Sequence, residues 1–299
     1  MNLKHLDIAI TGRCNRNCLH CAVAGRFRED LELQQFRDAL REFQPVELHL
    51  TGGEPRLHPY FKDILAIAVE FCERVSVVTS GGVSLEELWT WKNLGIYEIA
   101  VSVDGSSVDH DKLRGEGSYK DTLSTLCGCM AIGLRSRINT VVHEQNLSSA
   151  LRIIEVAEEW NVSRLAFIYL TEIGDARVHR LRSAKSTAWK SFLASLQELV
   201  SALQCEVTAQ NPFDQDWNCF SQACTVVQDV PAAMDSRGVV HNCPLLCGVQ
   251  KRDYERTLSA IRSYVISSKE TICGSMELLG RKIGKTEGRG CPLVATRIK

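Results

Sequence analysis

Three cysteines, Cys14, Cys18 and Cys21, lie within eight residues in the stretch CNRNCLHC, and their spacing is typical of a metal-binding loop. A structural zinc site takes four ligands, often as two pairs of cysteine or histidine. This stretch supplies three thiols, and no fourth cysteine or suitably spaced histidine follows nearby. An iron–sulfur cluster held by three cysteines would leave one iron open to another ligand. The loop therefore predicts such a cluster, with zinc or three metal-free cysteines as the alternatives.

The segment TGGEP, residues 51–55, is a second candidate binding element. Two consecutive glycines, Gly52 and Gly53, allow the backbone to approach a ligand closely because neither carries a Cβ. Their carbonyls and the Glu54 carboxylate can accept hydrogen bonds from an ammonium group. The alternative is an ordinary turn between a strand and a helix.

Both segments are positioned by alternating strand-like and helix-like patterns over residues 1–170. The apolar runs that we interpret as strands are residues 6–11, 46–51, 75–80, 96–103, 137–142 and 165–170. The amphipathic stretches between them are residues 31–43, 59–72, 85–93, 119–132 and 148–160. This alternation predicts parallel strands joined by right-handed crossovers, and hence an α/β fold with a partial (β/α)6 TIM-like barrel. In such a barrel the chemistry lies at the carboxyl ends of the strands.

Polar residues follow further predicted strands at the same end of the barrel. They are Ser80 after the third strand, Ser102 and Asp104 at the fourth, and Asn139 on the fifth. We expect them to face a ligand, although residues of this kind also cap helices or form turns.

The end of the sixth strand carries Tyr169, Glu172 and Asp175, which we expect near a substrate. Arg177 begins a basic run, residues 177–185, and can approach a ligand carboxylate. Basic runs of this kind are more often a solvated surface.

The pattern changes near residue 204, after a helix-like stretch at residues 186–203. We predict two domains, residues 1–203 and residues 204–299. The second is rich in cysteine, and Asp235-Ser236-Arg237-Gly238 predicts a hairpin turn within it. The cysteines of the predicted helices, Cys72, Cys127 and Cys129, and Cys205 after a helix, are expected to pack as small apolar residues.

Composition excludes several classes of protein. The formal net charge is −1 and the pI about 6.7, which gives no general attraction to nucleic acid or membranes. No apolar run approaches the roughly 20 residues of a membrane span, and no secretory signal begins the chain. Thirteen unevenly spaced cysteines, an odd number, argue against a disulfide framework and favour a reducing, cytoplasmic location.

The CxxxCxxC loop, the GGEP segment and the polar strand ends together resemble radical S-adenosylmethionine (radical SAM) enzymes. The resemblance implies a [4Fe–4S] cluster on Cys14, Cys18 and Cys21, with S-adenosylmethionine on the open iron. Reductive cleavage of that cofactor would give a 5′-deoxyadenosyl radical that abstracts a hydrogen atom from the substrate. The resemblance places the methionine amino group at Gly52, Gly53 and Glu54. The other cofactor contacts that it implies are Ser80 near the sugar, Ser102 and Asp104 near the ribose or the methionine carboxylate, and Asn139.

The later cysteines resemble the SPASM and twitch extensions of this family, which hold auxiliary clusters. Cys224, Gly238 and Cys243 match the pattern C-x13-G-x4-C, and Cys219 fits the additional ligand ahead of it. We choose Cys291 as the fourth ligand, with Cys247 and Cys273 as rivals. A full SPASM domain carries a CxxCx5CxxxC run, which is absent here, so one auxiliary [4Fe–4S] cluster is expected. Zinc on the same cysteines is the alternative.

We therefore expect a radical SAM enzyme that modifies a peptide by cross-linking, oxidation or epimerisation. The alternative is radical oxidation or rearrangement of a small molecule, such as a sugar, an aminocyclitol or an amino-acid derivative. A non-catalytic iron–sulfur or zinc protein is the alternative from another class. No peptide-recognition domain precedes the cysteine loop, which weakens the peptide reading. No acid or base is assigned, because Pro244 follows Cys243 where sulfatase-maturing relatives have an acid. The resemblance also implies an electron donor such as flavodoxin or ferredoxin.

Overall fold

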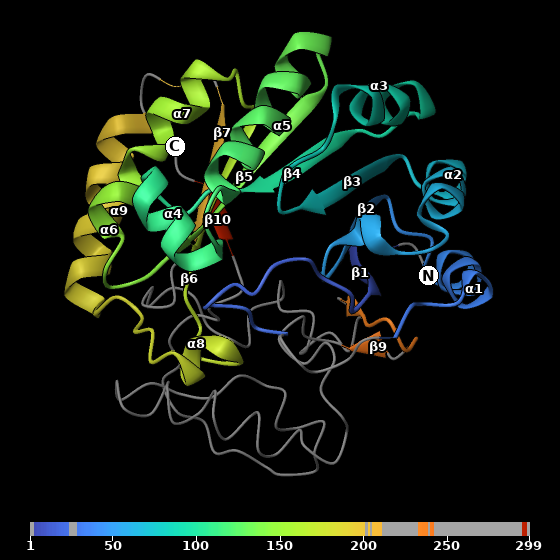
Figure 1. Cartoon of the computed structure of the whole chain (residues 1–299), viewed down its shortest axis with the longest axis horizontal. Helices are drawn as coiled ribbons and strands as arrows, with labels where there is room; N and C mark the ends of the chain where they lie inside the picture. Colours follow the sequence, from blue (N-terminus) through green and yellow to red (C-terminus); the bar gives the residue numbers. More distant parts are fainter. Residues whose placement is uncertain are drawn as a thin grey trace.

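The computed structural model describes residues 3–23, 29–200, 203, 205–210, 233–238, 240–241 and 295–297 (Figure 1). Seven strands belong to the βα units: β1 (His5–Thr11), β2 (Glu47–Gly52), β3 (Arg74–Thr79), β4 (Glu98–Ser102), β5 (Arg135–Val142), β6 (Arg164–Tyr169) and β7 (Glu206–Gln210). Three short strands follow: β8 (Ala233–Met234), β9 (Val240–His241) and β10 (Ala295–Arg297).

Helices connect the strands in the order expected for an α/β fold. The first half of the chain contains α1 (Leu33–Phe43), the 3-10 helix η1 (Pro55–Leu57), α2 (Phe61–Phe71), α3 (Leu85–Leu94), α4 (Ser107–Arg114) and α5 (Ser118–Ile132). The remaining helices are α6 (Leu147–Leu151), α7 (Ile153–Glu159), α8 (Asp175–Val178) and α9 (Ser186–Val200). In the described part of the chain, no helix combines the length and the apolar character needed to span a membrane.

The strands form one sheet in the order β10-β7-β6-β5-β4-β3-β2-β1-β8-β9. All neighbours from β8 through β1 to β7 are parallel, and the two outermost strands, β9 and β10, are antiparallel. Figure 1 shows α1, α2 and α3 beside β1 to β3 at the right of the view, and α6, α7 and α9 beside the other end of the strand order at the left. The prediction of a partial TIM-like barrel is confirmed, and its parallel part extends beyond the six predicted strands.

Alternating residues explain how the sheet is covered. In β1, Leu6, Ile8 and Ile10 are fully buried, and the residues between them take the opposite face. Leu48 and Leu50 of β2 repeat this pattern, and all five belong to the main apolar core. The face turned away from this core carries polar residues at the start of these two strands, namely His5, Asp7, Glu47 and His49.

The sequence interpretation missed α4, β7 and α8, and it merged α6 and α7 into one helix. The start of α9 packs against β6 and β7 through Trp189. Its ring contacts Tyr169 of β6 and Phe192 of the same helix, and its indole N–H donates to the Gln210 carbonyl of β7, 3.1 Å away. This contact holds the seventh strand in register with the barrel.

The predicted hairpin at residues 235–238 is present. β8 and β9 pair antiparallel around it, the Gly238 N–H donates to the Asp235 carbonyl at 2.9 Å, and Gly238 has a φ of +79°. β8 also pairs in parallel with β1, so the hairpin extends the barrel sheet. The strands described beyond residue 203 all join this sheet, and the domain boundary at residues 203/204 stays a prediction. The predicted auxiliary ligands Cys219, Cys224, Cys243 and Cys291, with Cys247 and Cys273, lie outside the described residues.

Candidate active site

The cysteine loop follows the carboxyl end of β1 and is held in place by backbone hydrogen bonds. The Cys21 N–H donates to the Cys18 carbonyl at 3.0 Å, which closes a turn. The Cys21 carbonyl in turn accepts from the Asp175 N–H of α8 at 2.9 Å. The Arg16 N–H points at the Cys14 sulfur, 3.4 Å away. All three thiols are free, and Cys14 is exposed.

The three cysteines open onto a cavity of about 590 Å³ at the carboxyl ends of the strands. Other residues that line it come from the ends of six strands and include Thr51, Thr79, Ser102, Val141, Tyr169 and Gln210. Of the predicted cofactor residues, Gly52, Gly53, Ser80 and Ser102 line this cavity together with the cysteines. Glu54, Asp104 and Asn139 are not among its lining residues. Asn139 is the cross-strand neighbour of Ser102 on β5.

The two glycines are required by the approach of β2 to the cysteine loop. A Cβ on Gly52 would lie 2.2 Å from the Thr11 carbonyl oxygen, and one on Gly53 would lie 2.1 Å from that of Arg13. The Gly53 N–H donates to Thr11 and the Glu54 N–H to Arg13, both at 2.8 Å. The segment therefore supports the start of the cysteine loop and faces the cavity at the same time.

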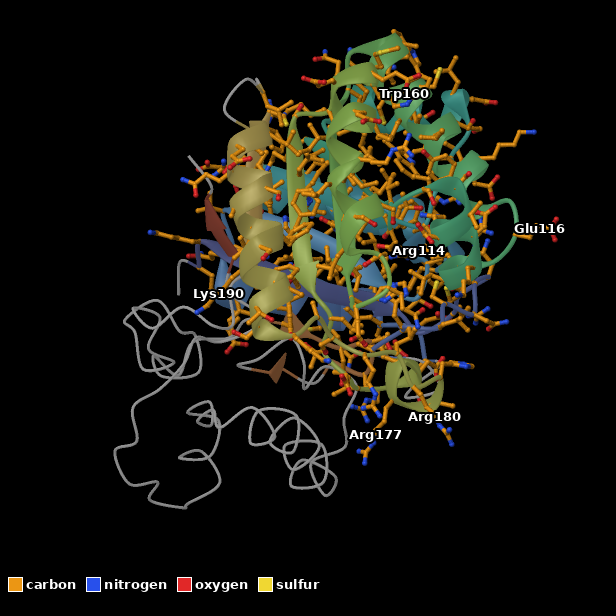
Figure 2. The ribbon with its side chains drawn as sticks, turned by 90° about the vertical axis from the view of Figure 1, so that its left-hand side faces the viewer. Arg114, Glu116, Trp160, Arg177, Arg180 and Lys190 are labelled. Atoms are coloured by element: carbon orange, nitrogen blue, oxygen red, sulfur yellow. The ribbon has the colours of Figure 1, made fainter. Side chains whose placement is uncertain are left out.

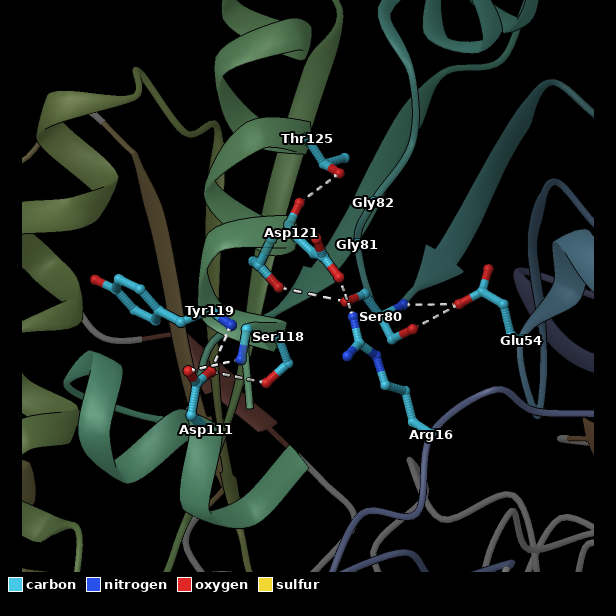
Figure 3. A network of polar contacts seen from close by, with 12 residues as sticks. Arg16, Glu54, Ser80, Gly81, Gly82, Asp111, Ser118, Tyr119, Asp121 and Thr125 are labelled. Atoms are coloured by element: carbon cyan, nitrogen blue, oxygen red, sulfur yellow. Dashed lines mark hydrogen bonds and ion pairs between the residues drawn. The ribbon is translucent and has the colours of Figure 1, made fainter. Parts of the chain in front are cut away.

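Glu54 is buried and its carboxylate is bonded within the protein (Figure 3). It accepts from the Thr79 hydroxyl, from the Ser80 N–H and hydroxyl at 2.9 Å, and from Arg56 Nε at 3.1 Å. Arg56 also donates to the carbonyl of Gly81. These bonds tie the TGGEP segment to the end of β3, while a contact of this carboxylate with a ligand stays a prediction.

Asp104 is fully buried and forms an ion pair with Arg114 of α4. The Arg114 Nε donates to Asp104 Oδ2 at 2.5 Å, and the Val141 N–H donates to Oδ1 at 2.8 Å. Burial raises the pKa of this carboxyl, but Arg114 and His20 outweigh it and lower the pKa to about 2. In the structure, Asp104 fixes Arg114, and its predicted contact with the cofactor stays a prediction.

Arg114 is a site residue that the sequence analysis missed. Its Nη1 lies 3.9 Å from the Cys18 sulfur and its Nη2 lies 3.1 Å from His20 Nε2. The Arg114 side chain is 10% exposed, and Figure 2 places it among the other side chains, away from the outline of the molecule. Burial and the neighbouring guanidinium lower the pKa of His20 to about 3, so His20 is neutral and can accept a hydrogen bond from Arg114. A fixed cation therefore faces one thiol of the loop.

Arg16, between Cys14 and Cys18, is a second cation beside the cavity. Its guanidinium pairs with Asp121 of α5, as Figure 3 shows. Asp121 also accepts, through its carbonyl, a hydrogen bond from the Gly82 N–H at 3.0 Å. Arg16 thus joins the cysteine loop to the loop after β3. Only its position inside the CxxxCxxC motif signals this role in the sequence.

The end of β6 places two of its three predicted residues at the cavity. Tyr169 and Asp175 line it, whereas Glu172 accepts from Arg182 at 2.9 Å and from the Ser183 N–H at 3.0 Å. Arg177 is exposed and does not line the cavity, and Figure 2 shows it at the edge of the molecule. Arg177 therefore belongs to a solvated surface.

The residues present fit an iron–sulfur cluster better than a single ion. Four tetrahedral bonds of about 2.3 Å would bring sulfur ligands of zinc within about 3.8 Å of one another. The sulfurs of Cys14, Cys18 and Cys21, all described, do not form a group within 4.8 Å. Burial raises the pKa of the Cys14 and Cys18 thiols, so a bound metal and nearby cations are needed to hold them as thiolates. The spread of the thiols, the cation at Cys18 and the adjoining cavity suit a cluster with one open position.

Comparisons with known proteins agree with this geometry. Residues 8–157, half of the chain, match the family model of the radical SAM superfamily. The Fe-coproporphyrin III synthase of Methanosarcina barkeri is 27% identical over 173 residues, which cover 55% of this chain and 43% of that protein. The PqqA peptide cyclase of Ruegeria pomeroyi is 30% identical over 166 residues, 52% of this chain and 44% of that protein. The chain thus spans less than half the length of these curated relatives.

Among solved structures, the chain is similar to Streptococcus suis SuiB bound to its precursor peptide SuiA. The TM-score is 0.69 at 14% identity, and the superposition covers 83% of this chain and 61% of SuiB. At this identity the similarity shows a shared fold. Together with the cysteine loop and the match of the family model, it leads to one conclusion: this chain belongs to the radical SAM superfamily.

Proposed function

We propose that this chain is a radical SAM enzyme that modifies a peptide. The observation that carries the enzymatic part is the loop of three free thiols that opens, beside Arg114, onto the cavity at the barrel's carboxyl end. A [4Fe–4S] cluster and S-adenosylmethionine bound there would together supply the one-electron chemistry that removes a hydrogen atom from a substrate.

The chain's own residues would bind, orient and shield these groups. Cys14, Cys18 and Cys21 would ligate the cluster, and Arg114 would offset part of its negative charge. Gly52, Gly53, Ser80 and Ser102 would line the pocket that binds the cofactor. Their positions in the wall of the cavity support this. Glu54, Asp104 and Asn139 complete the proposed set of cofactor-binding residues. Glu54 would act by holding the end of β3 and Asp104 by holding Arg114.

Peptide substrates are supported by two relatives, the PqqA peptide cyclase and SuiB, which was solved with a precursor peptide. The second candidate, a small molecule, is favoured by the similarity to Fe-coproporphyrin III synthase and to the GTP 3′,8-cyclase of Synechocystis, 27% identical over 215 residues. The modification would be a cross-link, an oxidation or an epimerisation.

The proposal includes one auxiliary [4Fe–4S] cluster on Cys219, Cys224, Cys243 and Cys291. Its support is the hairpin at residues 235–238, which the twitch-like pattern predicts and which is present between β8 and β9. It also includes a flavodoxin-like or ferredoxin-like electron donor and a cytoplasmic location, because free thiols require a reducing compartment.

The test is anaerobic reconstitution followed by reduction with dithionite and assay for 5′-deoxyadenosine. Cys18→Ala should abolish the product and lower the iron content from about eight to about four atoms per chain. The matched control, Cys127→Ala on the exposed face of α5, should change neither. A reduced cluster that yields no 5′-deoxyadenosine in the wild-type chain would refute the enzymatic proposal.

The substrate class is tested by adding short peptides encoded beside this gene and measuring their mass. Stimulation by a porphyrin or a nucleotide, and not by any peptide, would favour the small-molecule alternative.

A further inference from the structure

The amino end of the barrel, opposite the cavity, carries a second group of metal-ligating side chains. His5 begins β1, and Glu47 and His49 lie at the start of β2. One ligand atom from each of these three residues lies within 4.8 Å of the others, the one such group among the described residues. His5 and Glu47 are direct cross-strand neighbours, as are Asp7 and His49.

The alternation of the two strands explains this convergence. Leu6 and Ile8 of β1 and Leu48 of β2 are fully buried on the helix-covered face. His5, Asp7, Glu47 and His49 therefore share the opposite face of adjacent strands. Their side chains are 13% to 38% exposed, so an ion can reach them from solvent.

Asp7 orients both histidines. Its Oδ1 lies 3.0 Å from His5 Nε2 and 3.1 Å from His49 Nδ1, so it can accept a hydrogen bond from each ring. The opposite nitrogen of each ring is then left with its lone pair. His5 Nδ1, one of these nitrogens, lies 3.8 Å from Glu47 Oε2. A carboxylate that accepts from the outer nitrogen of a histidine is the arrangement that fixes metal-binding imidazoles in proteins.

We propose that His5, Glu47 and His49 form a binding site for a divalent transition-metal ion, with Asp7 as the outer carboxylate. Two imidazole nitrogens and one carboxylate oxygen suit zinc, cobalt or nickel rather than magnesium or calcium. The ion would join β1 to β2 at the amino end of the barrel, where catalytic residues are not expected. Its role would be to stabilise the fold.

Two arginines set the strength of this site. Arg74 Nη1 lies 2.8 Å from Glu47 Oε1 and leaves Oε2 directed at His5. Arg137 Nη1 lies 3.4 Å from His49 Nε2, so this guanidinium has to turn away when the ion binds. We therefore expect this site to bind a metal ion with moderate affinity. Added metal can also bind to the cysteine thiols, which compete with the site.

The experiment is a Co²⁺ titration of the cluster-loaded full-length chain under anaerobic conditions. Co²⁺ bound to nitrogen and oxygen shows d–d absorption without the intense thiolate charge-transfer band, which separates this site from the cysteines. We expect each wild-type chain to bind one equivalent of Co²⁺ that shows d–d absorption without the thiolate band. His49→Gln and Glu47→Gln should lose it, and Asp7→Asn should weaken it by about 10- to 100-fold. Glu206→Gln, a glutamate at the start of β7 paired with Arg164, is the matched control and should retain it.

Equal uptake of Co²⁺ by the wild-type chain and by the His5→Gln/His49→Gln double variant would overturn the proposal, as would Co²⁺ bound only with a thiolate band. Circular dichroism and iron content establish that each variant is folded. If a variant fails to fold, proton NMR of the Co²⁺-loaded wild-type chain decides. Two strongly shifted exchangeable imidazole N–H signals are expected, and the absence of any would reject the site.

Discussion

The two ends of the barrel are built by different kinds of contact. At the carboxyl end, close backbone contacts stand beside ion pairs such as Arg114–Asp104: Gly52 and Gly53 pack on residues 11–13, and the Asp175 N–H donates to the carbonyl of Cys21. At the amino end, side chains pair across neighbouring strands, as His49 of β2 does with Asp7 of β1 and Arg137 of β5 with Glu98 of β4. The first arrangement leaves thiols and hydroxyls facing a cavity, whereas in the second the polar side chains mainly pair with one another.

A buried arginine at each end shows how the surroundings differ. Burial by itself acts to lower the pKa of both guanidinium groups, and the neighbouring anionic groups act to raise it. At Arg114 the Asp104 carboxylate and Cys18 outweigh burial and raise the pKa, whereas at Arg137 the pKa remains lowered despite Glu98. The carboxyl end is thus the place where anionic groups stabilise a buried cation, as a site that holds thiolates requires.

The largest expected effect is that of removing Arg114. Arg114→Leu leaves Asp104 buried without its cation and should lower the free energy of unfolding by about 3–5 kcal/mol. Arg164→Leu at the other end should cost about 1 kcal/mol or less, because Arg164 is 25% exposed and Glu98 keeps Arg137. Urea unfolding of both variants measures the difference. Equal losses would show that the two ends are held in the same way.

The next largest effect is expected at Gly53, and a control at Gly95 separates the cost of a steric clash from the cost of a positive φ. Gly53→Ala places a Cβ 2.1 Å from the Arg13 oxygen and should cost about 2–4 kcal/mol and displace the cysteine loop. Gly95→Ala is the control: it has a φ of +103° but open space, and should cost about 1–2 kcal/mol. Unfolding and iron content after reconstitution report on both. Retention of wild-type iron content by the Gly53 variant would contradict the supporting role of this contact.

A pH effect is expected from His110, which is buried beside Asp104. The Asp104 N–H lies 3.2 Å from His110 Nδ1, which therefore accepts, and burial lowers the pKa of the ring to about 4. Between about pH 6.5 and 4 the unfolded chain binds this proton and the folded chain does not. Stability from the neutral ring is thus present above pH 6.5 and lost as the pH falls, by at most about 1.4 kcal/mol per unit. His110→Asn should flatten this slope in unfolding measured from pH 7 to 4; an unchanged slope would argue against a neutral ring.

The smallest effect is expected on the solvated basic surface. Arg177→Gln should change the free energy of unfolding by less than about 0.5 kcal/mol and leave 5′-deoxyadenosine formation unchanged, because Arg177 is exposed and does not line the cavity. Chemical unfolding and the product assay check this. A large loss of product would place Arg177 in the site after all.

Local patterns predicted much of the fold and part of the site. The six strands follow from apolar runs, and the turn at residues 235–238 follows from Asp-Ser-Arg-Gly, a segment that needs only its own neighbours to form. β7 was missed because its sequence, EVTAQ, contains only one large apolar residue, Val207. α4 was missed because its sequence, SVDHDKLR, has weak apolar periodicity.

The sequence by itself determined the three-thiol loop, the adjoining glycine pair and the order of strands, because each depends on residue type and short spacing. The tertiary structure alone decided what those residues approach. The glycines meet residues 11–13, which lie some forty positions earlier in the chain, and Arg114 meets Cys18 across 96 positions. It also turned His5 and His49 toward the same carboxylate. Such contacts depend on strand register and helix placement, which bring together side chains that no local pattern links.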